Sequence, residues 1–356
     1  MPSLKIPFRI LLLIILSLLV VSGCKNNESN PAGPNNDQTP SGQVDPFNQN
    51  KILGSGINIG NALEAPNEGD WGVIIKDEYF PTIKKAGFNS VRIPIKWSAH
   101  ALSSSPYTIN ASFFSRIDHV INEALKSKLA IVINIHHYDE IMQDPENEKD
   151  RFVALWSQIA ERYKNYSSDL FFELLNEPNG NLTPTIWNEL IKVTVAKIRE
   201  TNPYRTIILC PAEWSSISAL NQLEIPQNEN NVIVTFHYYN PFHFTHQGAE
   251  WVQGSDQWLG TKWTGTTQER TEIRNDFTQA ADWGSQHNIP LNIGEFGAYS
   301  KADIYSRIAW TTFVSQSASG FSFSWHYWEF CSGFGIYDPV NNKFYDALLN
   351  SLIPPV

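Results

Sequence analysis

Short apolar, β-rich runs recur along this chain, and helical patterns separate most of them. Each run is bounded by turn signals, which is typical of a buried parallel strand. The predicted strands lie near residues 52–60, 89–95, 130–136, 170–177, 206–212, 232–239, 290–296 and 320–328. The predicted helices are Glu78–Ala86, Phe113–Ser127, Asp150–Lys164, Thr185–Glu200, Glu269–His287 and Asp303–Ser317. Eight strands that alternate with helices predict an α/β fold of one domain, the parallel (β/α)8 or TIM barrel.

A doubly wound open sheet is the alternative fold. The glycine-containing stretch GlySerGlyIleAsnIleGly at 54–60 follows the first apolar run, as a dinucleotide-binding motif would. It continues into a polar loop rather than a helix, so the required strand–turn–helix context is missing. We therefore favour the barrel. Thr183 followed by Pro184 predicts a helix start there, with Thr183 as the N-cap.

Charge and composition narrow the class of ligand. The chain carries 26 basic and 36 acidic residues, a formal charge of −10, which opposes binding to phosphate backbones. Nucleic acid is therefore not an expected partner. Aromatic residues make up 13% of the chain, and many of them fall in the loops after predicted strands. This favours a flat ligand that can stack, such as a sugar ring.

The first 24 residues have the pattern of a signal peptide. Lys5 and Arg9 precede the apolar run Ile10–Val21, which is too short for a comfortable membrane span. The run ends in SerGlyCys, the order of a bacterial lipoprotein signal, so Cys24 is the predicted lipidation site. An ordinary secretory signal with a chance cysteine is the alternative. Either one predicts a protein outside the cytoplasm, as a cell-surface lipoprotein or a secreted protein.

Residues 25–49 are rich in Asn, Ser, Pro, Gly, Gln and Asp. Such a segment cannot bury enough apolar surface to fold, so we expect a flexible linker there. The catalytic domain is then expected to cover residues 50–356. Its two cysteines, Cys210 and Cys331, are predicted to be free thiols.

In a barrel of this kind the chemistry lies at the carboxyl ends of the strands. Polar or aromatic residues stand at every predicted strand end: Asn61, Glu64, Arg92, His136, His137, Asn176, Glu177, Glu213, Trp214, His237, Tyr238, Tyr239, Glu295, Trp325, Trp328 and Glu329. The connection 240–265, which contains His246 and Trp251, is predicted to form a loop over this site.

Two of these residues, Glu177 and Glu295, form the paired carboxylates that glycoside hydrolysis requires. If Arg92 and Tyr239 reach Glu295, they favour its ionised form, which suits a nucleophile. Glu177 has apolar neighbours and the neutral amide of Asn176, so it is expected to stay protonated as the acid. Pro178 is expected to hold Glu177 in an extended backbone.

Six motifs occur in an order that resembles glycoside hydrolase family 5: IleAsnIleGlyAsn (57–61), ArgIlePro (92–94), AsnGluPro (176–178), HisTyrTyr (237–239), GlyGluPheGly (294–297) and TyrTrpGluPhe (327–330). The likeness runs from about residue 45 to the end and is greatest to bacterial endo-β-1,4-glucanases that also take mannans. The resemblance implies a retaining double displacement with Glu177 as acid/base and Glu295 as nucleophile. It also implies supporting or substrate-binding positions: Asn61, Glu64, Arg92, His136, His137, Asn176, His237, Tyr239, His246, Trp251, Trp328 and Glu329.

Plainer interpretations stand beside these. Arg92 is compatible with a structural ion pair alone. His136 and His137 are adjacent and therefore point to opposite faces of a strand, which argues against a metal site. Trp214 and Trp325 are expected to pack at the rim of the core, and Glu213 to take no part. For Trp251, Trp258 and Trp263, substrate contact and closure of the loop onto the barrel are both open.

The sequence thus predicts a retaining endo-acting hydrolase of β-1,4-glucan that also acts on mannan, with a polysaccharide as its partner. No cofactor and no metal are expected, the membrane is reached only through the lipid anchor, and a monomer is expected. A mannan-specific hydrolase is one alternative. A non-catalytic glycan-binding lipoprotein is another, but a binder has no need of both carboxylates.

Overall fold

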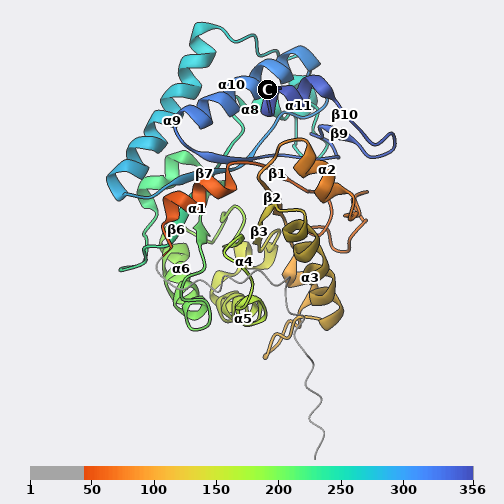
Figure 1. Ribbon diagram of the computed structural model, residues 1–356. Helices are drawn as coiled ribbons and strands as arrows, with labels where there is room; N and C mark the ends of the chain where they lie inside the picture. Colours follow the sequence, from red (N-terminus) through yellow and green to blue (C-terminus); the bar gives the residue numbers. More distant parts are fainter. Residues whose placement is uncertain (1–43, 356) are drawn as a thin grey trace, which may run out of the picture. The chain divides into compact units, whose positions relative to one another are not determined.

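The computed structural model describes residues 44–355, whose strands close into one parallel barrel in the order β1 to β8 (Figure 1). The strands are β1 Ser55–Asn58, β2 Ser90–Ile93, β3 Ala130–Asn134, β4 Leu170–Glu173, β5 Ile207–Leu209, β6 Val232–Tyr238, β7 Leu291–Phe296 and β8 Ser324–Tyr327. All eight lie within the predicted ranges. The closed barrel confirms the predicted fold class and excludes the open sheet.

Helices follow most strands and surround the barrel (Figure 1). They are α2 Tyr79–Lys85, α3 Ala111–Lys126, α5 Pro145–Tyr163, α6 Pro184–Arg199, α9 Thr267–His287 and α10 Ile304–Gly320. These are the six predicted helices. Thr183 caps α6 by accepting a hydrogen bond from the backbone N–H of Ile186, and Pro184 occupies the first turn, as predicted.

The remaining elements were not predicted. They are the α-helices α1 Pro46–Leu53, α4 Asp139–Gln143, α7 Ala212–Ser215, α8 Phe242–Thr245 and α11 Asp346–Leu352, the 3-10 helices η1 Trp97–His100, η2 Ile217–Gln222 and η3 Ser255–Trp258, and a hairpin of β9 Tyr337–Asp338 and β10 Lys343–Phe344. The first of these corrects a boundary. Helix α1 begins inside the segment 25–49 that was expected to be a linker, and Gln49 is buried. The signal peptide, Cys24 and the rest of that linker lie outside the described residues.

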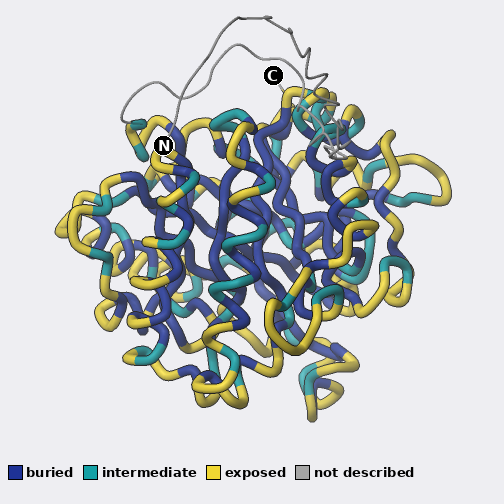
Figure 2. Tube along the Cα trace, turned by 90° about the horizontal axis from the view of Figure 1, so that it is seen from below, coloured by how far each residue is buried: buried dark blue, intermediate teal, exposed yellow. Residues whose placement is uncertain are grey.

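Strand residues alternate between two environments, because side chains two positions apart share a face. In β2, Val91 and Ile93 pack outward in the core that the helices cover, whereas Ser90 and Arg92 face the barrel interior. The strands are buried and the exposed chain lies in the outer ring and the loops (Figure 2).

Helix α1 closes the amino end of the barrel. Its Leu53 joins a small interior cluster with Ala130, Val132, Phe171, Ile208 and Ile233, one or two from each of four strands. Its Asn50 donates to the carbonyls of Leu291 and Ser322 and accepts from Ser324 Oγ at 2.6 Å. The amino end is therefore plugged, and the opposite end is left for a ligand.

Cys210 and Cys331 are free thiols, the first buried and the second half-buried, as predicted. Between residues 44 and 355, no helix combines the length and the apolar character that a membrane crossing requires.

Candidate active site

A cavity of about 480 Å³ lies at the carboxyl ends of the strands. Most of the predicted site residues line it: Asn61, Glu64, His136, His137, Asn176, Glu177, Tyr239, His246, Trp251, Glu295 and Trp328. Arg92, His237 and Glu329 do not line this cavity, and all three are buried. Residues from six strand ends and one long loop thus converge on one space, as the barrel geometry requires.

Arg92 is fully buried and organises the polar groups beneath the cavity. Its Nη1 donates to Glu295 Oε1 at 2.7 Å, and its Nη2 donates to Asn176 Oδ1 at 2.8 Å. It also forms a bidentate pair with Glu173, with distances of 2.6 and 2.7 Å, and donates to Asn58 Oδ1. The guanidinium therefore fixes the nucleophile candidate and orients Asn176, which bonds Arg92 rather than Glu177.

The sequence analysis missed Glu173 and Asn58. A signal was present, because a carboxylate inside the apolar run LeuPhePheGlu must be paired when it is buried. Glu173 follows Phe171 by two positions and so shares its inward face. Arg92 is consequently both a structural ion pair and a contact of Glu295, so the two interpretations of this residue are not exclusive.

Glu295 is positioned by a local irregularity of β7. The pairing skips Gly294, so that His237 lies opposite Glu295 after Phe236 lies opposite Ile293. A Cβ on Gly294 would lie 2.7 Å from Thr235 Oγ1, so no larger residue fits this bulge without displacing the neighbour. Tyr239 donates to Glu295 Oε2 at 3.0 Å, so both carboxylate oxygens have a donor.

Glu177 lies on the loop after β4, and its side chain is 29% exposed against 7% for Glu295. Its φ is +48°, so its backbone is left-handed and not extended as Pro178 was expected to make it. The local preference of a pre-proline residue has been overruled by the tertiary structure. A hydrogen bond of 2.7 Å joins Glu177 Oε1 to His237 Nδ1, and the same nitrogen lies 3.6 Å from Glu295 Oε2.

These contacts shift the pKa values of Glu177 and Glu295 in the directions opposite to those expected from the sequence. Burial raises the pKa of Glu177, but the hydrogen bond and the positive charge of His237 outweigh it, so this pKa lies below its ordinary value. Burial raises the pKa of Glu295 above its ordinary value, against the positive charges of His237 and Arg92. Burial lowers the pKa of His237, but the carboxylates of Glu295 and Glu177 outweigh it and raise this pKa. His237, which the sequence marked only as a supporting residue, therefore lies between the two carboxylates, and their charges raise its affinity for a proton.

Glu177, His237 and Glu295 also offer three potential metal ligands within 4.8 Å of one another. The ligating atoms already have partners, since His237 bonds Glu177 and Arg92 bonds Glu295. A bound cation would lie beside the Arg92 guanidinium, which would repel it. The donor set therefore suits a proton better than a metal ion.

Two more carboxylates hold the loops around the cavity. Glu64 accepts hydrogen bonds from the backbone N–H groups of Asn61 and Ala62, and Glu329 accepts from those of Cys331, Ser332 and Phe334. Burial raises the pKa of Glu64 to about 7 and that of Glu329 to about 8. Glu329 follows Trp328 through a cis peptide bond.

Aromatic rings form the walls of the cavity. Trp328 lies parallel to His136 at a centroid distance of 6.1 Å, and Trp71 meets His137 edge-on at 5.4 Å. On the long loop, Trp251 lines the cavity and is 61% exposed. His246 packs against Tyr239 at 4.8 Å, as a loop folded over the site requires.

The other tryptophans do not all have the burial that the sequence predicts. Trp325 is buried in the core, as expected, and so is Trp263, whereas Trp258 stacks on His243 outside the cavity. Trp214 is 60% exposed, so the expectation that it packs at the core rim is wrong. Its backbone is left-handed, with a φ of +57°.

Trp71, Tyr299, Ser332, Gly333 and Phe334 also line the cavity and were not predicted. All five lie in loops that follow the first, seventh or eighth strand. The enrichment of aromatics in such loops was a signal for Trp71, Tyr299 and Phe334, but it does not separate them from the buried aromatics.

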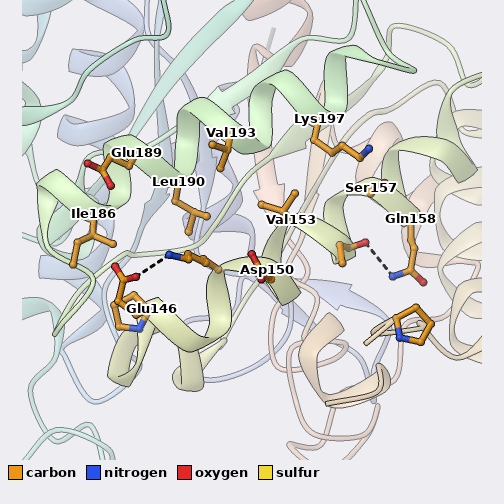
Figure 3. Close-up of a pocket in the computed structure, with 14 residues that line it drawn as sticks. Glu146, Asp150, Val153, Ser157, Gln158, Ile186, Glu189, Leu190, Val193 and Lys197 are labelled. Atoms are coloured by element: carbon orange, nitrogen blue, oxygen red, sulfur yellow. Dashed lines mark hydrogen bonds and ion pairs between the residues drawn. The ribbon is translucent and has the colours of Figure 1, made fainter. Parts of the chain in front are cut away.

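A larger hollow of about 740 Å³ lies on the outer ring between α5 and α6 (Figure 3). Val153, Ile186 and Leu190 form its apolar part, and Glu146 pairs with Lys149 at 2.8 Å (Figure 3). This groove lacks a buried cluster of titratable groups. The chemistry therefore belongs to the cavity at the strand ends.

Comparison with known proteins agrees with this geometry. The family model described as "Cellulase (glycosyl hydrolase family 5)" matches residues 50–333. Endoglucanase H of Acetivibrio thermocellus is 36% identical over 318 residues, which are 88% of this chain and 34% of that protein. This chain spans about a third of the length of the first curated relatives.

Solved structures of similar length also match. Thermotoga maritima Cel5A in complex with mannotriose is 58% identical, with a TM-score of 0.85, and covers 86% of this chain and 100% of that one. The same enzyme in complex with cellobiose is 58% identical, with a TM-score of 0.86 and the same coverage. Because the family match extends over most of the chain and includes both strand-end glutamates, the chain belongs to glycosyl hydrolase family 5.

Proposed function

We propose that this protein is a retaining endo-β-1,4-glucanase that uses Glu295 as nucleophile and Glu177 as acid/base. The observation that carries the proposal is the spacing of the two carboxylates, since one oxygen of each lies within 4.8 Å of the other and of His237 Nδ1. Retaining glycosidases place these carboxyl groups about 5–5.5 Å apart, whereas inverting enzymes leave about 6.5–9.5 Å for a water molecule.

The contacts assign the roles. Glu295 is held on both oxygens by Arg92 and Tyr239, so it can attack the anomeric carbon from a fixed position. The bond from that carbon to the leaving oxygen breaks as Glu177 protonates the oxygen. Glu177 then removes a proton from water, which attacks the same carbon and releases Glu295.

His237 is the proposed source of the proton that the first step needs. Transfer of a proton from His237 to Glu177 along the 2.7 Å hydrogen bond would leave a neutral histidine and a protonated acid. Binding of a sugar chain removes water from the pair and favours the neutral state of both partners. The greater exposure of Glu177 also suits a residue that activates water in the second step.

Azide rescue tests the two roles with 2,4-dinitrophenyl β-cellobioside, whose leaving group needs no protonation. Glu177→Ala should form the glycosyl-enzyme, and azide should attack it to give β-cellobiosyl azide. Glu295→Ala should lose at least about a thousandfold in kcat on cellulose oligosaccharides, and azide should enter from the vacated face to give the α-azide.

Glu189→Ala serves as the matched control, because Glu189 is exposed on α6 away from the cavity. If Glu177→Ala gave the α-azide and Glu295→Ala the β-azide, the assigned roles of acid/base and nucleophile would be wrong. A wild-type protein that releases no reducing sugar from soluble cellulose would instead support a non-catalytic glycan-binding protein.

Action on β-mannan is proposed as a second activity of the same site. The support is that the 58% identical Cel5A was solved with both mannotriose and cellobiose. A panel of glucan, mannan, glucomannan, xyloglucan and xylan should show hydrolysis of the first three. Loss of glucan and mannan hydrolysis together in Glu295→Ala would place both at one site, and persistence of either would separate them.

We further propose that the protein works as a monomer outside the cytoplasm, anchored through a lipid on Cys24. The support is the lipoprotein-type order SerGlyCys after the apolar run 10–21. Radiolabelled palmitate should enter the wild type and not Cys24→Ala in a bacterial host. Equal labelling of both proteins would exclude this anchor. Light scattering of the catalytic domain, residues 50–356, measures whether it is a monomer.

A further inference from the structure

The turn that follows Glu177 holds this residue in an unfavourable backbone conformation. The φ of +48° lies in the left-handed region, which a residue with a side chain seldom adopts unless neighbouring groups impose it. The carbonyl of Glu177 accepts a hydrogen bond of 2.7 Å from Asn179 Nδ2, so the side chain of Asn179 reaches back across Pro178. The direction in which the Glu177 carboxyl points therefore depends on the position of Asn179.

The same turn is bonded to α4, the short helix that follows β3. The backbone N–H of Asn179 donates to Met142 Sδ at 3.3 Å. The backbone N–H of Asn181 donates to the carbonyl of Met142 at 2.9 Å, and Asn181 Nδ2 donates to the carbonyl of Gln143 at 2.7 Å. Three hydrogen bonds thus join residues 179–181 to the carboxyl end of α4.

Gly180 allows the turn and the helix to meet closely. Its φ is +63°, and a Cβ at this position would lie 2.9 Å from the carbonyl oxygen of Met142. A larger residue would therefore have to move the turn away from α4 and would also strain its own backbone. Met142 is half-buried and packs against the hydrophobic core, so it gives the turn a fixed point of contact.

We propose that Met142 is a positioning residue for the acid/base candidate, because its sulfur and its carbonyl hold the turn 179–181 that orients Glu177. This inference rests on the proposed role of Glu177. The thioether is a weak acceptor, but it is the acceptor that the structure gives to the N–H of Asn179. Loss of this acceptor lets the turn move from α4, so the Glu177 carboxyl loses its alignment with the leaving oxygen. Glu295 is held by other contacts and keeps its position.

Norleucine tests the sulfur alone, because it replaces this atom by a methylene group. The chain has two methionines, Met1 and Met142, so biosynthetic replacement of methionine alters a single side chain among residues 44–355. We compare kcat/KM for cellotetraose, whose leaving sugar needs a proton, with kcat/KM for 2,4-dinitrophenyl β-cellobioside, whose leaving group does not. The norleucine protein should lower the ratio of the first value to the second about three- to tenfold.

Met142→Leu is the control for the other methionine. When this variant is made once with methionine and once with norleucine, the two proteins differ only at Met1. Their ratios should be equal to each other and lower than that of the wild type, since leucine fills the space of Met142 but offers no acceptor.

The second readout is the step in which Glu177 activates water. Gly180→Ala should displace the turn, so kcat on the dinitrophenyl substrate should fall by about tenfold, because hydrolysis of the glycosyl-enzyme lacks its base. Azide needs no base, so it should restore most of this rate and give β-cellobiosyl azide, with little effect on the wild type. Gly260→Ala is the matched control. Gly260 is also left-handed, but an added Cβ would have no non-neighbouring heavy atom of residues 44–355 within 4 Å.

An unchanged ratio in the norleucine protein would overturn the proposal. An equal loss on both substrates would overturn it as well, since Met142 would then only support the fold. If Gly180→Ala does not fold, the norleucine protein still decides. A Glu177→Ala variant that hydrolyses cellotetraose at the wild-type rate would instead refute the proposed role of Glu177, so the two failures are distinguishable.

Discussion

Individual side chains in the site are defined by their partners rather than by their residue type. Arg92 uses its donors on two carboxylates, Glu173 and Glu295, and on two amides, so one buried cation bonds both the scaffold and Glu295. Tyr239 donates a hydrogen bond to the second oxygen of Glu295. His237 lies between the carboxylates of Glu177 and Glu295. The site therefore depends on contacts between residues on or directly after β2, β4, β6 and β7.

Tyr239→Phe should lower kcat on cellotetraose by about ten- to a hundredfold, with little change in KM. The variant removes a hydrogen bond to a charged group, worth about 1.5–3 kcal/mol, and leaves the ring in place against His246. Steady-state kinetics check this, with Tyr345→Phe on the exposed surface as the control. A rise in KM at constant kcat would show that Tyr239 binds substrate and does not orient Glu295.

Removal of metal ions should leave activity unchanged. Arg92 already supplies the positive charge beside Glu295, and His237 occupies the contact to Glu177 through which a metal would bind. Dialysis against a chelator, followed by assay on soluble cellulose, checks this. A loss of rate that a divalent cation restores would instead assign the cluster of Glu177, His237 and Glu295 as a metal site.

Among the elements, α1 and the turn after β5 contribute more than their length suggests. Helix α1 has only eight residues, yet its Leu53 and Asn50 close the amino end of the barrel. The turn at residues 213–215 lies at the other end, where Glu213 and Trp214 line a second hollow of about 670 Å³. Short elements thus determine which end of the barrel is closed and how far the cleft extends.

Asn50→Ala should lower the free energy of unfolding by about 1–3 kcal/mol. Asn50 is buried, and its loss leaves Ser324 Oγ and the carbonyls of Leu291 and Ser322 without this partner. Denaturant unfolding measures the effect, and Lys51→Ala, exposed on the same helix, should change it by no more than about 0.5 kcal/mol. Equal effects of the two variants would mean that α1 does not stabilise the barrel.

At the scale of the whole molecule, the carboxyl end of the barrel buries several carboxylates close together. Glu64, Glu295 and Glu329 are all nearly inaccessible, and the charge of Glu64 adds to the raised pKa of Glu329. Burial raises the pKa of each of these carboxyl groups in the folded protein. Stability is therefore coupled to pH through the same residues that shape the cavity.

The stability of the wild type should fall more steeply between about pH 4.5 and 8 than that of Glu329→Gln. Burial raises the pKa of Glu329 from 4.5 to about 8, so in this interval the unfolded chain has released a proton that the folded protein keeps. Each pH unit then costs up to about 1.4 kcal/mol, and the loss ends above the folded pKa. Glutamine imitates the protonated carboxyl and does not titrate.

Unfolding in denaturant at pH 5, 6, 7, 8 and 9 measures this difference. Glu189→Gln, on the exposed face of α6, should keep the slope of the wild type. Parallel curves for the wild type and Glu329→Gln would show that Glu329 is ionised in the folded protein, in which case its three backbone donors outweigh its burial.

Local sequence was sufficient for the barrel and for the position of the site. The apolar runs and helical patterns have periods that neighbouring residues set, so all eight strands and the six long helices were predictable. Strand ends in such a barrel share one face, which brought Glu177 and Glu295 together without any distance being known. Helix α1 was not predicted because its sequence is mostly polar, although Asp45 and Pro46 form a start signal.

The tertiary structure alone decided the electrostatics and the extent of the cleft. Arg92 pairs with Glu173, and His237 bonds Glu177 and has a raised pKa. These features depend on burial and on contacts between residues 60 to 203 positions apart. The backbone of Glu177 is left-handed against the preference of a residue that precedes proline. The exposure of Trp214 depends on a turn that its own residue types disfavour. Sequence periodicity determines which face a side chain occupies, but a pKa or a strained turn depends on what the rest of the chain packs against it.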